Sequence, residues 1–301
     1  MSAFGSTPVI IEAAINGGVT KERNPHVPRA PAEVARDALA CMEAGAAVIH
    51  THTDAPGFGG TAAHDPAPYR EAWRAILAAR PDALLHPTVP GGGPGVTMAE
   101  RFSHIETLAE EGLLAFGALD PGSMNVGGED PEGLPADVDR IFQTTFRDIR
   151  YALDSCLRHR VGISASIFEP GFLRTMLAFD HAGKLPHGTM LKLYFGSRPG
   201  LTFGLPPTLT SLEAYLQMLE GSSAAWFVST IGGDCVRSGM ARHAIERGGH
   251  VVVGIEPYGG DRVPTNRELV EEAVALAAAV GRPVATPAEA AELLGLERRR
   301  R

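Results

Sequence analysis

Eight short runs of apolar and β-branched residues recur along this chain of 301 residues, each separated from the next by a longer stretch. The runs are Val9–Ile15, Ala47–His52, Ala83–Thr88, Leu113–Leu119, Val161–Phe168, Leu191–Phe195, Ala225–Ile231 and Val251–Glu256. Runs of this kind predict buried strands, and the stretches between them have helical periodicity. Eight strand–helix units without an internal linker predict an α/β fold, a single (β/α)8 TIM barrel domain over residues 1–301 with short terminal extensions.

Apolar periodicity and N-terminal capping signals mark the helices between the strands. The expected helices are Pro31–Ala44, Tyr69–Ala79, Met98–Glu111, Ala136–Arg158, Leu212–Leu219, Cys235–Arg247 and Asn266–Val280, with a last one after Thr286. Four threonines precede a glutamate by three residues, the spacing of a capping box: Thr97, Thr210, Thr265 and Thr286. A doubly wound open sheet is the alternative, but the segment Asn16–Lys21 after the first run lacks a dinucleotide fingerprint.

The charge balance limits the partners of the chain. A formal net charge of -8 and a pI near 5.8 argue against nucleic acid and membrane surfaces as general partners. Cys41, Cys156 and Cys235 have no paired spacing, which is typical of a reducing compartment. We find no signal-peptide pattern and no apolar run of membrane-spanning length. We therefore expect a cytoplasmic protein.

Two histidines close the second apolar run. Side chains two residues apart in a strand share a face, so His50 and His52 point to one place while Thr51 faces away. Glu256 closes the last run and adds a carboxylate. Two imidazoles and one carboxylate form a ligand set that leaves positions open on zinc, ferrous iron or manganese. The sequence therefore predicts a catalytic metal site.

The expected barrel allows these three ligands to converge. The active site of such a barrel lies at the C-terminal edge of its strands, and all three side chains lie at strand ends. The second and eighth strands flank the first in a closed ring, so their ends are close in space. The alternative is that the two histidines close a strand by coincidence or form hydrogen bonds in a packed core.

The same residues carry a resemblance that spans nearly the whole chain. The matching segments are Glu12–Gly18, Thr20–Lys21, Asn24–Pro28, Ala44–Ala46, His50–His52, Gly91–Gly92, Pro121–Gly127, Gly204–Thr208, Gly248–His250, Gly254–Glu256 and Pro264–Asn266. Through them the chain resembles the β-keto acid cleavage enzyme family.

The resemblance implies a zinc-dependent barrel that transfers part of a β-keto acid to acetyl-CoA and releases acetoacetate and a new acyl-CoA. It implies His50, His52 and Glu256 as the zinc ligands, although the ligand set also suits another divalent metal. A metal that binds the keto and carboxylate oxygens polarises the carbonyl for attack. The resemblance also implies a homo-oligomer, a tetramer or a dimer.

Substrate contacts are expected just after the third strand, where the family holds the substrate carboxylate. Thr88 offers a hydroxyl there. Gly91 and Gly92 let backbone N–H groups approach an anion closely. A simple turn is the alternative for this Pro/Gly-rich loop.

The chain departs from the family where acid–base groups are expected. The family's Asp after the last ligand is Pro257 here, and its Arg four residues before that ligand is Val252. Proline cannot accept a proton, so either other groups have taken over this role or the reaction differs. Lys192 and Arg262 are candidate anion contacts, with a surface pair to Asp261 as the alternative for Arg262.

Glu12 and Asp120 are the candidate catalytic acid and base. A carboxylate inside the first strand costs free energy to bury unless it is paired or protonated, and Glu12 lies between the strands that carry the ligands. Asp120 follows the fourth strand. Different surroundings would push their pKa values apart and divide the two roles. Internal hydrogen bonding is the structural alternative for Glu12.

Three functions fit these residues. The first is β-keto acid cleavage with acetyl-CoA. The second is a divergent metal-dependent lyase or hydrolase on the same barrel that does not use CoA, motivated by Val252 and Pro257. The third is a non-catalytic metal-binding or sensory protein. Consumption of acetyl-CoA separates the first from the others, and product formation without CoA separates the second from the third.

Overall fold

A computed structural model describes residues 7–55, 64–91, 95–197 and 203–296 of the chain. Eight strands form one sheet in the order β3-β2-β1-β10-β9-β8-β7-β4, and all paired neighbours are parallel. They are β1 (Ile11–Ala14), β2 (Val48–Thr51), β3 (Leu84–Pro87), β4 (Phe116–Leu119), β7 (Gly162–Ile167), β8 (Thr189–Gly196), β9 (Ala225–Ile231) and β10 (His250–Val253). Ala115, just before β4, donates its N–H to the carbonyl of Leu85 in β3 at 2.8 Å, which joins the two edges of the sheet. The predicted (β/α)8 TIM barrel is confirmed.

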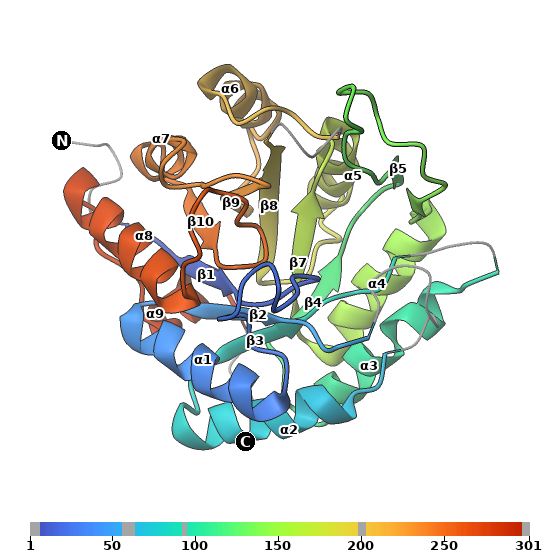
Figure 1. The fold of residues 1–301 in the computed structure, drawn as a ribbon. Coiled ribbons are helices and arrows are strands. Elements are labelled where there is room, and N and C mark those ends of the chain that lie inside the picture. The colour runs from blue at the N-terminus through green and yellow to red at the C-terminus, as the bar shows by residue number, and fades with distance from the viewer. Residues whose placement is uncertain (1–6, 56–63, 92–94, 198–202, 297–301) are drawn as a thin grey trace.

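Helices surround this barrel (Figure 1). They are α1 (Pro31–Ala44), α2 (Ala67–Ala79), α3 (Met98–Glu110), α4 (Phe146–His159), α5 (Pro170–His181), α6 (Leu209–Met218), α7 (Met240–Glu246), α8 (Asn266–Val280) and α9 (Pro287–Leu293). A small antiparallel hairpin, β5 (Met124–Asn125) and β6 (Ile141–Phe142), lies between β4 and α4 in the chain. Within the described ranges, no helix is both long and apolar enough to cross a membrane.

Two helices have the predicted bounds because both of their ends carry strong signals. Helix α1 begins with Pro31 in its first turn and ends at Gly45, whose φ of 120° stops the helix. Helix α8 is capped by Thr265 and ends at Gly281, with φ 86°. The capping boxes at Thr97 and Thr286 are confirmed as well. These ends depend on local interactions alone, which a sequence exposes directly.

Other helix predictions were wrong at their starts. The helix expected from Ala136 begins only at Phe146, because Thr145 caps it and the preceding residues form strand β6. Helix α6 is capped by Thr208, whose side chain accepts from the N–H of Ser211 at 3.2 Å, so the capping box expected at Thr210 is not formed. Helix α7 begins at Met240, after Gly239 with φ 84°. Local features set these starts, namely the caps Thr145 and Thr208 and the left-handed Gly239, which the periodic pattern alone did not single out.

Candidate functional site

His50 and His52 point into the C-terminal mouth of the barrel, as the strand alternation predicts. Their Nε2 atoms lie 3.1 Å apart. Thr51 faces the opposite side, where its hydroxyl accepts from the indole N–H of Trp73 at 3.1 Å. Glu256 joins the two histidines, with one oxygen 3.2 Å from His52 Nε2 and the other 3.4 Å from His50 Nε2. The structure therefore brings together the three side chains predicted as metal ligands.

The spacing of these atoms fits a metal ion. Ligands at about 2.0–2.1 Å in a tetrahedral zinc site lie about 3.3 Å from one another, close to the three separations found here. The two Nε2 atoms, 3.1 Å apart, can share one proton in a hydrogen bond, and a divalent ion would take the place of that proton. The buried Oε2 of Glu256 also has no hydrogen-bond partner among the described residues. The donor set and its geometry therefore suit a divalent ion.

Local electrostatics hold His50 and Glu256 in the forms that bind metal. Burial lowers the pKa of His50 to about 4, so the imidazole is neutral at pH 7. Burial alone would raise the pKa of Glu256, but His52 and His50 outweigh it and hold that pKa well below its usual range. A neutral imidazole and an ionised carboxylate are the states a metal requires.

The backbone that carries Glu256 is fixed by close packing against β1. Gly254, with φ 138°, passes so near the carbonyl of Ala14 that a side chain there would overlap it. Just beyond, the N–H of Glu256 donates to that carbonyl at 3.2 Å, and the N–H of Ile255 donates to Asn266 at 2.7 Å. These contacts hold the glutamate beside the end of β2.

A line of buried polar side chains continues behind His50. Its Nδ1 lies 3.1 Å from Nδ1 of His86, and Nε2 of His86 lies 3.2 Å from Oε1 of Glu12. The Nζ of Lys192 donates to the same oxygen at 3.0 Å. All four residues are buried, and they come from β2, β3, β1 and β8. We call them the buried relay.

Metal binding would select one proton arrangement in the buried relay. If Nε2 of His50 binds a metal, its Nδ1 carries the proton and donates to Nδ1 of His86. His86 then carries its own proton on Nε2 and donates it to Glu12. The competing arrangement, in which Nδ1 of His86 donates to the carbonyl of Pro87 at 3.2 Å, would protonate Nε2 of His50 and block the metal.

Glu12 is an ionised anchor rather than a group open to substrate. Burial raises its pKa, but Lys192 and His86 outweigh burial and lower the pKa to about 2. The pKa of Lys192 is raised above its usual range, because Glu12 outweighs the effect of burial. His86 and Lys192 line the pocket described below, whereas Glu12 is fully buried and does not. The structure therefore does not bring Glu12 to the place where the sequence analysis expected a catalytic acid or base.

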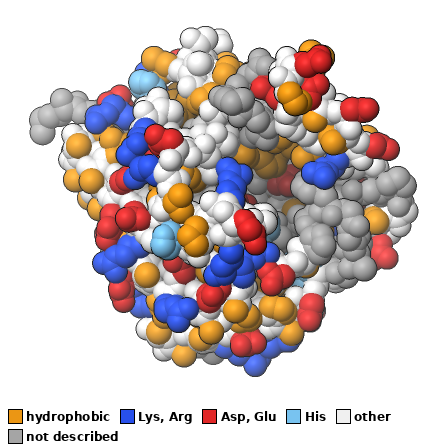
Figure 2. All heavy atoms as spheres, in the orientation of Figure 1, with side chains coloured by type: hydrophobic (Ala, Val, Ile, Leu, Met, Phe, Trp, Pro, Cys, Tyr) orange, Lys and Arg blue, Asp and Glu red, His pale blue; other side chains and the backbone are white. Residues whose placement is uncertain are grey.

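A pocket of about 250 Å³ opens beside the candidate metal ligands. In the view of Figure 2, a hollow lies near the centre of the molecule. Hydrophobic side chains are seen in its wall, and acidic and basic side chains are interspersed around it. The polar lining residues beyond the ligands are His86, Thr88, Asp120, Ser164, Ser166 and Lys192. Apolar and aromatic side chains supply most of the remainder.

Asp120 lies in this pocket, where the sequence analysis expected a catalytic group. Burial raises the pKa of Asp120 to about 6, although a hydrogen bond from Ser166 and the charge of Lys192 oppose the rise. The register explains the cluster, since Ser166 pairs with Lys192 and Asp120 follows β4 beside them. A carboxyl group with a pKa near neutrality can both accept and release a proton at physiological pH.

The expected substrate contacts have different positions. Thr88 and Gly91 line the pocket, and the backbone of Thr88 is held by Nε2 of His104, which donates to its carbonyl at 2.9 Å. Gly92 lies outside the described residues. Arg262 is a correction: its guanidinium binds Glu272 at 2.6 Å and Asp234 at 3.2 Å and is not part of the pocket lining. These two carboxylates hold it on the outer loops.

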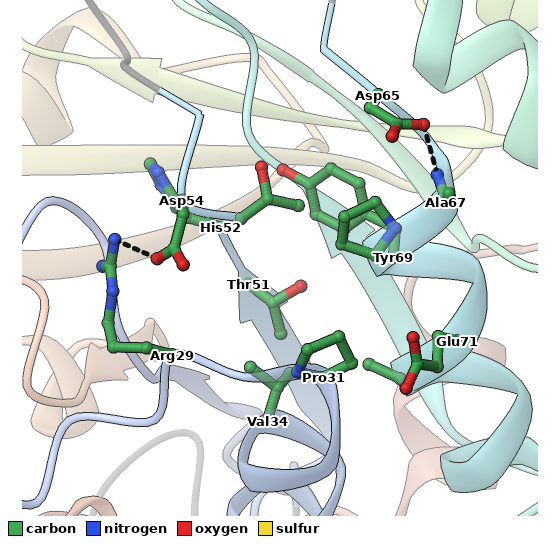
Figure 3. Close-up of a pocket in the computed structure, with 13 residues that line it drawn as sticks. Arg29, Pro31, Val34, Thr51, His52, Asp54, Asp65, Ala67, Tyr69 and Glu71 are labelled. Atoms are coloured by element: carbon green, nitrogen blue, oxygen red, sulfur yellow. Dashed lines mark hydrogen bonds and ion pairs between the residues drawn. The ribbon is translucent and has the colours of Figure 1, made fainter.

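A second cleft of about 230 Å³ lies on the other side of His52, between the loop after β2 and the starts of α1 and α2. Two of its acidic side chains, Asp54 and Asp65, already have partners (Figure 3). Arg29 forms an ion pair with Asp54, and Asp65 accepts from the N–H of Ala67 at 2.8 Å. All three candidate ligands line the first pocket, whereas His52 alone lines the second.

Sequence reasoning missed how the pocket wall is built. Phe168, just beyond β7, stacks on Tyr194 of β8 with ring centroids 5.0 Å apart and meets Phe203 edge-on at 5.8 Å. The alternation of Ser164, Ser166 and Phe168 along β7 placed all three on one face. That period of two was the available signal.

Comparisons with known proteins agree with this geometry. A family model described as beta-keto acid cleavage enzyme matches residues 8–296. The 3-keto-5-aminohexanoate cleavage enzyme of Acetoanaerobium sticklandii is 33% identical over 295 residues, which cover 96% of this chain and 99% of that protein. The 3,5-dioxohexanoate:acetyl-CoA acetone transferase of Paraburkholderia graminis is 27% identical over 307 residues and 96% of each chain.

Among solved structures, the apo structure of ObcA is similar with a TM-score of 0.67 and 16% identity, over 90% of this chain and 66% of that chain. A likeness at this level of identity concerns the fold alone. The family match, in contrast, extends over nearly the whole chain and includes every candidate ligand. This chain therefore belongs to the β-keto acid cleavage enzyme family, a family of enzymes.

Proposed function

We propose that this protein is a zinc-dependent β-keto acid cleavage enzyme that uses acetyl-CoA and releases acetoacetate and an acyl-CoA. In this reaction the bond between C2 and C3 of the keto acid breaks. The acetyl–sulfur bond of acetyl-CoA also breaks as a bond forms between that C2 and the acetyl carbon, and the released CoA sulfur takes the remaining acyl group. The observation that carries the proposal is the convergence of His50, His52 and Glu256 at a pocket of a chain in this family.

The three ligands would hold the metal, and a divalent ion there would supply a Lewis acid that polarises the keto and carboxylate oxygens of the substrate. Thr88 and the N–H groups near Gly91 would hold the substrate carboxylate. Lys192 has donors left after it binds Glu12, so it would supply the positive charge that the family usually has at the position of Val252. Asp120 would take the substrate proton in place of the missing acidic residue at Pro257.

Glu12 would act as a positioning residue. It binds Lys192 and His86 and so fixes the ammonium in the pocket and, through His86, the ring of His50. Groups that orient a metal-binding histidine raise metal affinity without touching the substrate. This role accounts for a carboxylate that is fully buried and ionised.

The test is metal content and turnover in the same preparations. Wild type should hold about one zinc per chain and form acetoacetate from acetyl-CoA and a β-keto acid, whereas His50→Ala and Glu256→Gln should lose both. His181→Ala, at an exposed histidine of α5, is the matched control and should lose neither. Protein without bound metal, or metal-loaded protein that leaves acetyl-CoA unconsumed with every keto acid tried, would contradict the proposal. Bound iron or manganese in place of zinc would change the identity of the metal in the proposal and leave the proposed reaction as it is.

The second candidate is a metal-dependent lyase or hydrolase on the same barrel that does not use CoA. Pro257 and Val252, which replace the family's acidic residue and arginine, favour it. Pro257 lines the pocket, where it offers no acid–base group. Product formed from a β-keto acid without acetyl-CoA, and lost with the metal, would support this candidate over the first.

The proposal includes a cytoplasmic location and a homo-oligomer, a dimer or a tetramer. Three free and buried cysteines support a reducing compartment. Size-exclusion chromatography with light scattering would give the mass of the assembly. A monomer at micromolar concentration would contradict the proposed homo-oligomer.

A further inference from the structure

The outer part of the pocket is apolar on the side away from the metal ligands. Six side chains form what we call the apolar wall: Met124, Phe142, Phe168, Tyr194, Phe203 and Ile231. They come from the β5–β6 hairpin, from the ends of β7, β8 and β9, and from the segment that follows β8. Four of the six are aromatic, and Phe168 contacts both Tyr194 and Phe203.

Polar groups lie deeper than this wall. Ser166 and Lys192 are register partners inside the barrel. Phe168 and Tyr194 follow two residues later on the same faces, and therefore nearer to the mouth. A keto acid whose carboxylate and keto oxygens reach the ligands and the polar groups would thus lay the rest of its acyl chain along the apolar wall.

The described charges of the pocket are unfavourable for a cationic acyl chain. The two lining carboxylates are Glu256, which belongs to the ligand set, and Asp120, which accepts from Ser166 beside Lys192. The ring of Tyr194 has the Lys192 ammonium 5.7 Å from its centroid. A second cation against that ring would meet this ammonium and a metal ion of the same sign.

A second carboxylate at the far end of the chain is also unfavourable. Among the described lining residues, Lys192 carries the one ammonium or guanidinium group. It is bound to Glu12 below the apolar wall. Arg262 faces Glu272 and Asp234 instead of the pocket. An anion placed against the phenyl rings of Phe142, Phe168 and Phe203 loses hydration without gaining a partner.

We propose that this site selects β-keto acids whose acyl end is neutral and apolar, and that it discriminates against acyl ends with an ammonium or a second carboxylate. This inference rests on the proposed function, because it takes the β-keto acid as the ligand of the pocket. It differs from the substrate in the name of the relative from Acetoanaerobium sticklandii, which carries an amino group.

Three acids with six-carbon chains test the inference. They are 3-oxohexanoate, which is apolar at its far end, 3-keto-5-aminohexanoate, which adds an ammonium to the same skeleton, and 3-oxoadipate, which ends in a second carboxylate. Calorimetry on the zinc-loaded protein without acetyl-CoA measures binding apart from turnover. We expect 3-oxohexanoate to bind at least about 100-fold more tightly than either charged acid, since even an added hydroxyl is rejected by about that factor in an apolar site.

A charge placed next to the apolar wall provides the matched variant. Val126 is half-buried and lines the pocket beside Met124, whereas Val138 is 49% exposed and does not line it. Val126→Asp should shift the ratio of affinities toward 3-keto-5-aminohexanoate by at least about tenfold, because it supplies the missing counter-charge. Val138→Asp should leave the ratio at the wild-type value.

The outcomes separate this inference from the proposed function. Equal or tighter binding of either charged acid by wild type, or equal shifts in the two aspartate variants, would overturn the inference. The expected order of binding, together with no consumption of acetyl-CoA by any acid, would support the selectivity and overturn the proposed reaction. Failure of all three acids to bind would overturn both.

Discussion

His86 lies directly behind His50, with their Nδ1 atoms 3.1 Å apart and their rings stacked at a centroid distance of 4.4 Å. His50 faces the candidate metal site with its other nitrogen. The same His86 contacts Glu12 through Nε2, so one imidazole joins a candidate ligand to a buried carboxylate. His86 and Glu12 therefore fix the orientation of His50, although neither of them belongs to the candidate ligand set.

Replacing His86 should therefore weaken metal binding. His86→Phe keeps a ring of similar shape but removes the acceptor for the Nδ1 proton of His50, and loss of such a partner lowers metal affinity by about 10- to 100-fold. Competition with a chelating dye measures this affinity. His250→Phe is the matched control, because His250 is also buried but begins β10 at the opposite end of the barrel. Wild-type zinc affinity in His86→Phe would contradict the role.

Gly17 and Gly18 provide a second matched pair. Gly17 has φ 52°, and a β-carbon there would overlap the side chain of Glu256, whereas a β-carbon at Gly18 meets no atom within 4 Å. Gly17→Ala should displace the carboxylate of Glu256. Zinc affinity should then fall by at least about tenfold, because a well-placed ligand is lost. Gly18→Ala should stay within about twofold of wild type, since it changes no ligand or support. Equal effects of the two substitutions on dye competition would show that the packing of Gly17 on Glu256 is unimportant.

The convergence of the three candidate metal ligands could be predicted from the sequence because each step needed only a regular pattern. Alternation put His50 and His52 on one face, and the closed order of strands brought Glu256 beside them. The bounds of α1 and α8 followed from caps that are local in the chain. Patterns of this kind do not depend on how distant side chains pack.

The remaining features depend on packing across the barrel. Glu12, His86 and Lys192 lie on β1, β3 and β8, and nothing local indicates that they meet. The direction of Arg262 is set by two carboxylates distant in the chain, Asp234 and Glu272. The segment before α4 has little periodicity, so its hairpin could not be told from an early helix start.

Asp120 should control the pH dependence of turnover. A base must be ionised to act, and burial raises the pKa of Asp120 to about 6, so kcat should rise with pH through about 6. Asp120→Asn should lower kcat by about 10²- to 10⁴-fold, which is the usual contribution of a general base. It should also abolish the rise of kcat with pH near 6, which we call the acid limb. Steady-state rates from pH 5 to 8 at saturating substrate measure kcat and its pH dependence. The zinc content of the variant should not change.

Asp54→Asn is the control for this prediction. Asp54 is exposed and pairs with Arg29 in the neighbouring cleft. Its substitution should leave both kcat and the acid limb near their wild-type values. A retained limb in Asp120→Asn would assign the titration to another group.

The buried pair of Glu12 and Lys192 should be coupled in stability. Removing one partner of a buried ion pair leaves the other charge without compensation and costs about 3–5 kcal/mol. Glu12→Gln and Lys192→Met should each lower the free energy of unfolding by an amount of that order. The double variant should lose less than the sum of the two by about 1–3 kcal/mol, the usual coupling of contacting residues. Urea unfolding followed by circular dichroism measures all four proteins.

Acidification tests the same pair independently. The pKa of Glu12 is about 2 in the folded protein and 4.5 ordinarily, so the carboxylate stabilises the fold fully above about pH 4.5 and loses that contribution as pH falls toward 2. The free energy of unfolding of wild type should therefore decrease over this window. Glu12→Gln should show a smaller decrease, although Glu33 and Glu256, whose pKa values are also lowered, keep part of the slope. Equal slopes in the two proteins, or strict additivity in the double variant, would mean that Glu12 is not held as an anion by Lys192 and His86.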